Sequence, residues 1–186
     1  MDKIIQRVCS WNAARYEQEY NKDLALSLLA EEYKEWTDAE NNVDKLDAMC
    51  DLIYVAIGVL WKIGKEEADW QYAAESVDSI VDVPDLAPAY FIAPLLTVYE
   101  LDETFSVIQV MQRIVFVAIA QMLYMGLSYD QAIEALNIVC DANDSKSIKK
   151  TASDVKANTD KGPYFRSPEP RLTKLLEDAG CLWTTH

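Results

Sequence analysis

Apolar residues recur with the period of an α-helix over most of the chain, and this pattern limits the fold more than any other feature. No stretch of the sequence shows the alternation of apolar and polar residues that a half-buried strand requires. Of the 186 residues, 51% are hydrophobic and only five are glycine, which is typical of a globular domain. We therefore predict a single all-α domain, residues 1–186, built as a helical bundle. The expected helices span residues 2–20, 23–40, 43–63, 66–80, 103–126 and 128–141.

Two segments depart from this helical pattern. The stretch 82-DVPDLAPAYFIAP-94 holds three of the six prolines and must interrupt a helix. From residue 142 onward the periodicity fades, so we predict a loop-rich C-terminal tail over 142–186.

The most apolar segment, residues 105–126, raises the question of a membrane span. It carries Gln109, Gln112, Arg113 and Gln121, so we expect it to fall short of a span and to form the central helix of a soluble bundle. The first residues, MDKIIQRVCSW, lack the apolar core of a signal peptide. We expect no contact with a membrane.

Charge and cysteine usage exclude further classes. The formal net charge of −14 makes binding to a nucleic acid backbone repulsive. The four cysteines, at positions 9, 50, 140 and 181, are far apart, and the single histidine is His186, so a zinc site is not expected. Reduced thiols and a cytoplasmic location are the simplest interpretation.

The stretch 28-LLAEEYKEW-36 places acids where the periodicity calls for apolar residues. Residues three or four apart share a helix face, so Leu28, Glu32 and Glu35 line one stripe, with Glu31 beside it. In the next predicted helix, the acids Asp47 and Asp51 share a face with Tyr54, and Asp51 is followed directly by the apolar run LIYVAIGVLW. The short polar connection near residues 37–43 predicts antiparallel packing, which would bring the two acidic stripes together.

A cluster of ionised carboxylates on facing, largely apolar surfaces is unfavourable unless cations balance it. Within this stretch only Lys34 and Lys45 are basic, and Lys34 points away from Glu32. Two or more Mg²⁺ or Mn²⁺ ions would resolve the conflict, because hard cations bind carboxylate oxygens. The lack of histidine argues against a di-iron site. The alternative is a solvated acidic face in an acidic protein.

The motif EEYKE, followed by LDAMCDLIYVAIG, resembles the all-α nucleotide pyrophosphohydrolases of the MazG-like group, especially the viral and phosphoribosyl-ATP-hydrolase-like branch. The resemblance implies a MazG-like bundle in which Glu32, Glu35, Asp47 and Asp51 bind the metal ions. Many members have E-x-x-D in the second helix, whereas the position three before Asp51 is Ala48. Asp47 would then act from one residue earlier.

A second resemblance lies in the tracts 143-NDSKSIKK-150 and 161-KGPYFRSPEPRL-172, which are similar to an asparagine-and-lysine element that closes many phage members. Seven of the 17 basic residues lie between residues 143 and 171, against four acids. Asn143, Lys146 and Lys161 are therefore candidates for binding phosphate oxygens. The alternative is an ordinary lysine-containing tail.

These features together predict a metal-dependent nucleoside triphosphate pyrophosphohydrolase, with Glu31 orienting or deprotonating the attacking water. Trp11 and Asn12 could stack on and hydrogen-bond a base, although ordinary core packing is the favoured interpretation of Trp11. The viral branch includes MazZ-type enzymes that convert dGTP to dGMP, which implies a preference for dGTP or GTP and a location in the host cytoplasm. A broad house-cleaning pyrophosphatase and a non-enzymatic acidic interaction protein, such as a DNA mimic, remain as alternatives. The expected partners are a nucleoside triphosphate and further copies of the chain in a homo-oligomer, a dimer or tetramer.

Two segments of the sequence resemble each other: 51-DLIYVAIGVLWKIG-64 and 113-RIVFVAIAQMLYMG-126 share V-A-I and a closing glycine. Two buried helices can reach similar apolar sequences independently. An ancient duplication is the other explanation, with Arg113 now standing where Asp51 stands in the first copy. The chain would then contain an internal pseudo-repeat.

Overall fold

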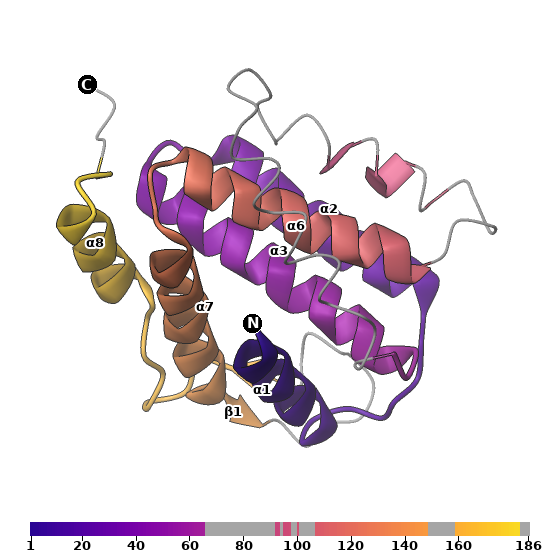
Figure 1. Cartoon of the computed structure of the whole chain (residues 1–186). Coiled ribbons are helices and arrows are strands. Elements are labelled where there is room, and N and C mark those ends of the chain that lie inside the picture. The colour runs from indigo at the N-terminus through magenta and orange to yellow at the C-terminus, as the bar shows by residue number, and fades with distance from the viewer. Residues whose placement is uncertain (66–91, 94, 98–99, 101–106, 149–158, 183–186) are drawn as a thin grey trace.

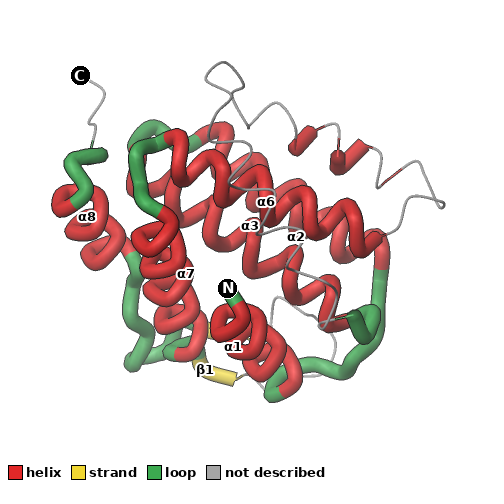
Figure 2. Tube along the Cα trace, in the orientation of Figure 1, coloured by secondary structure: helices red, strands yellow, loops and turns green. Residues whose placement is uncertain are grey.

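The computed structural model describes residues 1–65, 92–93, 95–97, 100, 107–148 and 159–182. Its elements follow in the order α1 (Asp2–Ala13), α2 (Lys22–Asp38), α3 (Asn42–Lys62), α6 (Val107–Tyr124), α7 (Tyr129–Asp144), β1 (Ser147–Ile148), β2 (Thr159–Asp160) and α8 (Glu169–Asp178). The described part of the chain is thus all-α except for one two-residue ladder, as the periodicity predicted (Figure 2). The predicted helix over 66–80 and the proline-rich stretch 82–91 lie outside the described residues.

Helix α3 is the centre of the bundle. It packs along α2 and α6, while α1, α7 and α8 also contact it (Figure 1). α2 and α3 form the predicted antiparallel pair, and each begins at an asparagine, Asn21 or Asn41, whose side chain accepts a hydrogen bond from a backbone N–H of the first turn. The inner face of α3 is fully buried and consists of Leu46, Met49, Leu52, Ile53, Ile57 and Leu60.

Helix α6 passes the length and composition test for a membrane span, so the expectation that it falls short of one was wrong. It has a mean hydropathy of 1.6 over 18 residues, because Arg113 is its one charged residue. Half of this helix is nevertheless buried within the protein, where it packs along α3. Its position is therefore that of a core helix of the bundle.

The similar segments of α3 and α6 also end alike. Gly64 follows α3 with φ of +66°, and Gly126 follows α6 with φ of +102°. Independent similarity of two buried helices and an ancient duplication both account for this ending, since glycine adopts the left-handed conformation that commonly closes a helix.

Two segments differ from what the sequence predicted. α1 ends at Ala13 instead of residue 20, and the following loop is held against the end of α3 by a hydrogen bond of 2.7 Å from Gln18 Nε2 to the Trp61 carbonyl. The predicted loop-rich tail contains a helix, α8, whose Leu172 and Leu176 are fully buried against the bundle. The sequence analysis missed α8 because prolines and a glycine precede it closely, although Leu172, Leu175 and Leu176 have helical spacing.

The ladder between β1 and β2 fixes how the C-terminal segment returns to the bundle. Ser147 pairs with Asp160 and Ile148 pairs with Thr159, in antiparallel register. In the same register the next opposite positions are Lys146 and Lys161. Two lysines that are 15 residues apart in sequence therefore lie at one end of the ladder.

Candidate functional site

Asp47 and Asp51 lie one turn apart on α3, on the face that the end of α7 approaches. Both side chains are partly buried, and Cys50 between them is fully buried. One carboxylate oxygen of Asp47, Oδ1, is buried and has no hydrogen-bond partner among the residues that the structure describes. A buried oxygen of this kind is an unsatisfied acceptor.

Asn143 and Lys146 connect α7 to these acids. Lys146 Nζ donates a hydrogen bond of 2.6 Å to Asn143 Oδ1. Burial raises the pKa of Asp51, and the side chain of Asn143 lies close enough to oppose part of this rise. Asn143 thus joins a carboxylate of α3 to a lysine that lies 95 residues further along the chain.

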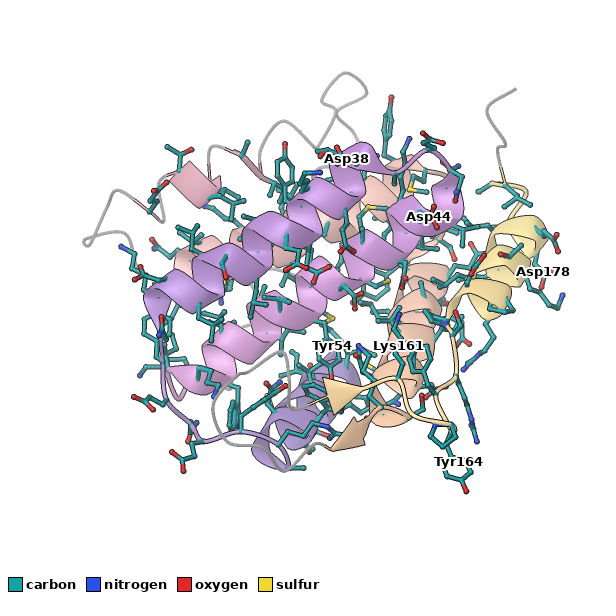
Figure 3. The ribbon with its side chains drawn as sticks, turned by 180° about the vertical axis from the view of Figure 1, so that it is seen from behind. Asp38, Asp44, Tyr54, Lys161, Tyr164 and Asp178 are labelled. Carbon is teal, nitrogen blue, oxygen red and sulfur yellow. The ribbon has the colours of Figure 1, made fainter. Side chains whose placement is uncertain are left out.

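Lys161 approaches the same group from the opposite strand of the ladder. Its ammonium lies 5.1 Å from the centre of the Phe165 ring, and its charge lowers the pKa of Asp51. Figure 3 labels Lys161, which follows β2, and Tyr54, which is one turn beyond Asp51 on α3. The three polar residues predicted from the C-terminal tracts, Asn143, Lys146 and Lys161, therefore meet at the carboxylates.

The surroundings disfavour ionisation of the two aspartates. Loss of hydration on burial and the charge of Asp51 raise the pKa of Asp47 to about 7, and Lys146 opposes this shift. Burial also raises the pKa of Asp51 to about 6, with Glu35 adding to the effect and Lys146 opposing it. The positive charge present is therefore insufficient to stabilise both carboxylates in the ionised form.

The glutamates of α2 do not all reach this pair. Glu35 is exposed but close enough to influence both aspartates, whereas Glu31 and Glu32 are partly buried and make other contacts. Among the described residues, no three histidine, cysteine or acidic side chains lie close enough together to hold a metal ion. In the described structure, Asp47 and Asp51 thus lie together with Glu35 nearby. Glu31 and Glu32 do not join them.

Trp11 lies in the interior, in agreement with the core alternative. Its indole Nε1 donates a hydrogen bond of 2.9 Å to the Asn143 carbonyl. The rings of Tyr16 and Tyr54 meet it edge-on, and the guanidinium of Arg15 lies 4.4 Å from its centre. Arg15 therefore covers one face of the indole. Trp11 also lines an open depression of about 510 Å³ beside α1, with Lys3, Gln6, Arg7, Ser10, Arg15 and Asp144.

Asn12 is buried as well. Its Nδ2 donates to the Val8 carbonyl at 2.8 Å within α1, and the side chain packs on Gly58, where an added Cβ would lie 3.4 Å from it. Trp11 and Asn12 therefore fasten α1 to α3 and α7 in this structure. Sequence analysis missed Arg15, which follows Trp11 at helical spacing and reaches the Lys146 carbonyl at 3.4 Å.

Residues 1–66 match the family model described as phosphoribosyl-ATP pyrophosphohydrolase. The match confirms the resemblance of the acidic motifs in this segment to the MazG-like superfamily of nucleotide pyrophosphohydrolases. The match supports nucleotide pyrophosphohydrolase activity in general, and it covers all five acids of the candidate site. The viral, MazZ-type assignment stays a prediction. The comparison with curated proteins found no match, and neither did the comparison with solved structures.

The raised pKa values give the stability of the metal-free protein a specific pH dependence. The pKa of Asp47 is about 7 when folded against an ordinary 3.8, so the folded state holds a proton that the unfolded chain has released between these values. Stability contributed by this group therefore falls as the pH rises from about 4 to about 7. We expect Asp47→Asn to remove this decline.

Urea unfolding in EDTA, at steps from pH 4.5 to 7.5, measures the effect as the difference between wild type and variant. Asp130→Asn, which alters an exposed acid at the start of α7, is the matched control and should follow the wild-type curve. A constant difference between Asp47→Asn and wild type across this range would contradict the assignment.

Proposed function

We propose that the protein is a metal-dependent nucleoside triphosphate pyrophosphohydrolase, which releases a nucleoside monophosphate and pyrophosphate. The observation that carries this proposal is the meeting of Asp47 and Asp51 with Asn143, Lys146 and Lys161. Carboxylates that suit a divalent cation and lysines that suit phosphate oxygens lie next to each other, although they come from distant parts of the chain. The family match over residues 1–66 supports the same class of chemistry.

The donor groups fit Mg²⁺ or Mn²⁺. The buried Oδ1 of Asp47 lacks a partner, and the raised pKa values of both aspartates reflect a shortage of positive charge. The ligands that the resemblance implies are Glu32, Glu35, Asp47 and Asp51, which offer oxygen atoms only. Asp47 and Asp51, with Glu35 nearby, already lie together, whereas Glu32 would have to move to reach the same ion. Divalent ions at this site would supply electrophilic activation of the α-phosphate.

The remaining roles follow from charge and position. Water attacks the α-phosphorus, and the bond to the oxygen that bridges the α- and β-phosphates breaks. Glu31 is the proposed residue that orients this water and accepts its proton. Lys146, which precedes β1, and Lys161, which follows β2, would balance the charge that develops on the departing pyrophosphate.

The proposed base preference is for guanine, as dGTP or GTP, and it rests on the resemblance to the viral branch. A broad house-cleaning pyrophosphatase is the second candidate, and the interior placement of Trp11 and Asn12 favours it. A site that hydrogen-bonds a base discriminates strongly, because the wrong base leaves buried polar groups unpaired. Because Trp11 and Asn12 already make contacts within the protein, other groups would have to discriminate between bases.

The acidic interaction protein, or DNA mimic, fits the structure less well. That class needs its acids spread over exposed faces. Asp47 and Asp51 are instead partly buried, and the charges of Lys146 and Lys161 act on Asp51.

The first test of the proposal is Asp51→Asn. An amide cannot supply the charge that holds a divalent cation, so we expect hydrolysis of nucleoside triphosphates in Mg²⁺ to fall roughly 100-fold or more. Release of pyrophosphate, followed with a coupled pyrophosphatase, measures the rate, and circular dichroism confirms the fold. The exposed Asp130→Asn should keep full activity. Activity of Asp51→Asn within a few-fold of wild type would refute the site.

Base preference is tested separately by kcat/KM for dGTP, dATP, dCTP, dTTP and dUTP under identical conditions. The guanine proposal predicts a dGTP to dATP ratio of at least about 100, which corresponds to roughly 3 kcal/mol of discrimination. A flat profile would identify the broad house-cleaning enzyme, and a pyrimidine preference would contradict both.

A further inference from the structure

The open depression beside α1 carries positive charge in an otherwise acidic protein. It runs along α1 next to the end of α7, the helix that α1 contacts (Figure 1). Three cations, Lys3, Arg7 and Arg15, line it, and Asp144 is the one acid among its described lining residues. The chain as a whole has 31 acids against 17 lysines and arginines. The charge of this depression is therefore the reverse of what the composition predicts.

Two of these cations have no carboxylate partner in the part of the chain that the structure describes. Lys3 is exposed and makes no ion pair there. Arg15 donates only to two backbone carbonyls, at 3.3 and 3.4 Å, and its buried Nε has no partner among the described residues. Both bonds are longer than the usual value of about 2.9 Å. Much of the hydrogen-bonding capacity of this guanidinium is thus unused.

Arg7 is paired, but one of its partners can be exchanged. Its guanidinium donates to Asn137 at 3.1 Å, to Asp141 at 2.7 Å and to Asp144 at 2.6 Å. Asp144 is the partner that lines the depression, and its side chain is 50% exposed. Exposed ion pairs of this kind contribute little to stability. An anion in the depression could therefore replace Asp144 at Arg7, while the other two partners keep the guanidinium in position.

The spacing of the polar groups indicates the shape of this anion. Lys3, Arg7 and Ser10 lie on successive turns of α1, and Ser10 adds an exposed hydroxyl to the lining. With a rise of roughly 1.5 Å per residue, Lys3 and Ser10 are about 10 Å apart along the helix axis. A single phosphate is too short to meet the whole row, whereas a chain of phosphates can follow it. The depression, at about 510 Å³, has room for such a chain.

We propose that this depression binds a linear oligophosphate, at a site separate from the pair of aspartates on α3. The two unpaired cations attract the chain, and Arg7 joins them when the chain displaces Asp144. The site needs no metal ion and does not depend on the proposed function. A nucleic acid is also a chain of phosphates, but the net charge of −14 would repel so large a polyanion.

The test is the affinity for tripolyphosphate, measured by titration calorimetry in EDTA at low ionic strength, where screening is weak. We expect wild type to bind it at least about tenfold more tightly than orthophosphate, because the longer chain meets more cations. Lys3→Gln removes an exposed charge and should weaken binding about fivefold. Lys174→Gln removes a lysine that pairs with Asp178 on α8 and is the matched control, which should keep the wild-type affinity.

Asp144→Asn tests the exchange at Arg7 with the opposite sign. It removes the charge with which the anion competes, so tripolyphosphate should bind about threefold more tightly than to wild type. Asp130→Asn removes an exposed acid at the other end of the same helix and should leave the affinity unchanged. Circular dichroism of each variant confirms the fold. Equal affinities of Asp144→Asn and Asp130→Asn would contradict the exchange.

A nucleoside triphosphate carries the same phosphate chain, and dGTP titrated in the same way distinguishes the source. Binding that depends on Lys3 and is tighter than that of tripolyphosphate identifies a nucleotide, and equal or weaker binding identifies the inorganic chain. Absence of tripolyphosphate binding to wild type, or equal affinities of Lys3→Gln and Lys174→Gln, would overturn the site. Loss of binding in Lys161→Gln, with full binding in Lys3→Gln, would also overturn it, because the phosphates would then lie at the candidate functional site.

Discussion

Two carboxylates one turn apart on the central helix lose much of their hydration where α7 packs against α3, and the rest of the protein has to supply the missing charge. Asp47 and Asp51 cannot move away from each other, because α3 is fixed by neighbours on several sides. The raised pKa of each group measures how incompletely the protein meets this demand. A structure that keeps such an unfavourable pair on its central helix gains no stability from it, which is typical of a functional site.

The elements around α3 can be understood as the means by which charge is brought to this pair. Helix α7 ends at the site and delivers Asn143, and the turn after it delivers Lys146. The ladder then returns the chain so that Lys161 comes to lie opposite Lys146. α1 secures this arrangement through Trp11 and Arg15. The family match ends at residue 66, so Lys146 and Lys161 come from a part of the chain that the match does not cover.

Much of this was accessible from the sequence. The antiparallel pair α2 and α3 follows from helical periodicity and a short polar connection, and Asp51 was conspicuous because an apolar run follows it. The local excess of basic residues and the family resemblance were enough to name Asn143, Lys146 and Lys161 as candidates. The sequence could not predict that they lie near Asp51, since this depends on how α7 and the ladder pack in three dimensions. The role of Trp11 was equally hidden, because a buried indole and a stacking platform have the same sequence signature. α8 was missed because the proline-rich stretch before it suggested a loop, although Leu172, Leu175 and Leu176 follow helical spacing.

The central claim is that water attacks the α-phosphorus of a nucleoside triphosphate at the Asp47–Asp51 pair. The most direct measurement is hydrolysis of dGTP in ¹⁸O-labelled water with Mg²⁺ or Mn²⁺, followed by mass spectrometry of both products. The account predicts nucleoside monophosphate that carries one ¹⁸O atom, together with unlabelled pyrophosphate. Label in the pyrophosphate, or release of orthophosphate and a diphosphate, would contradict it.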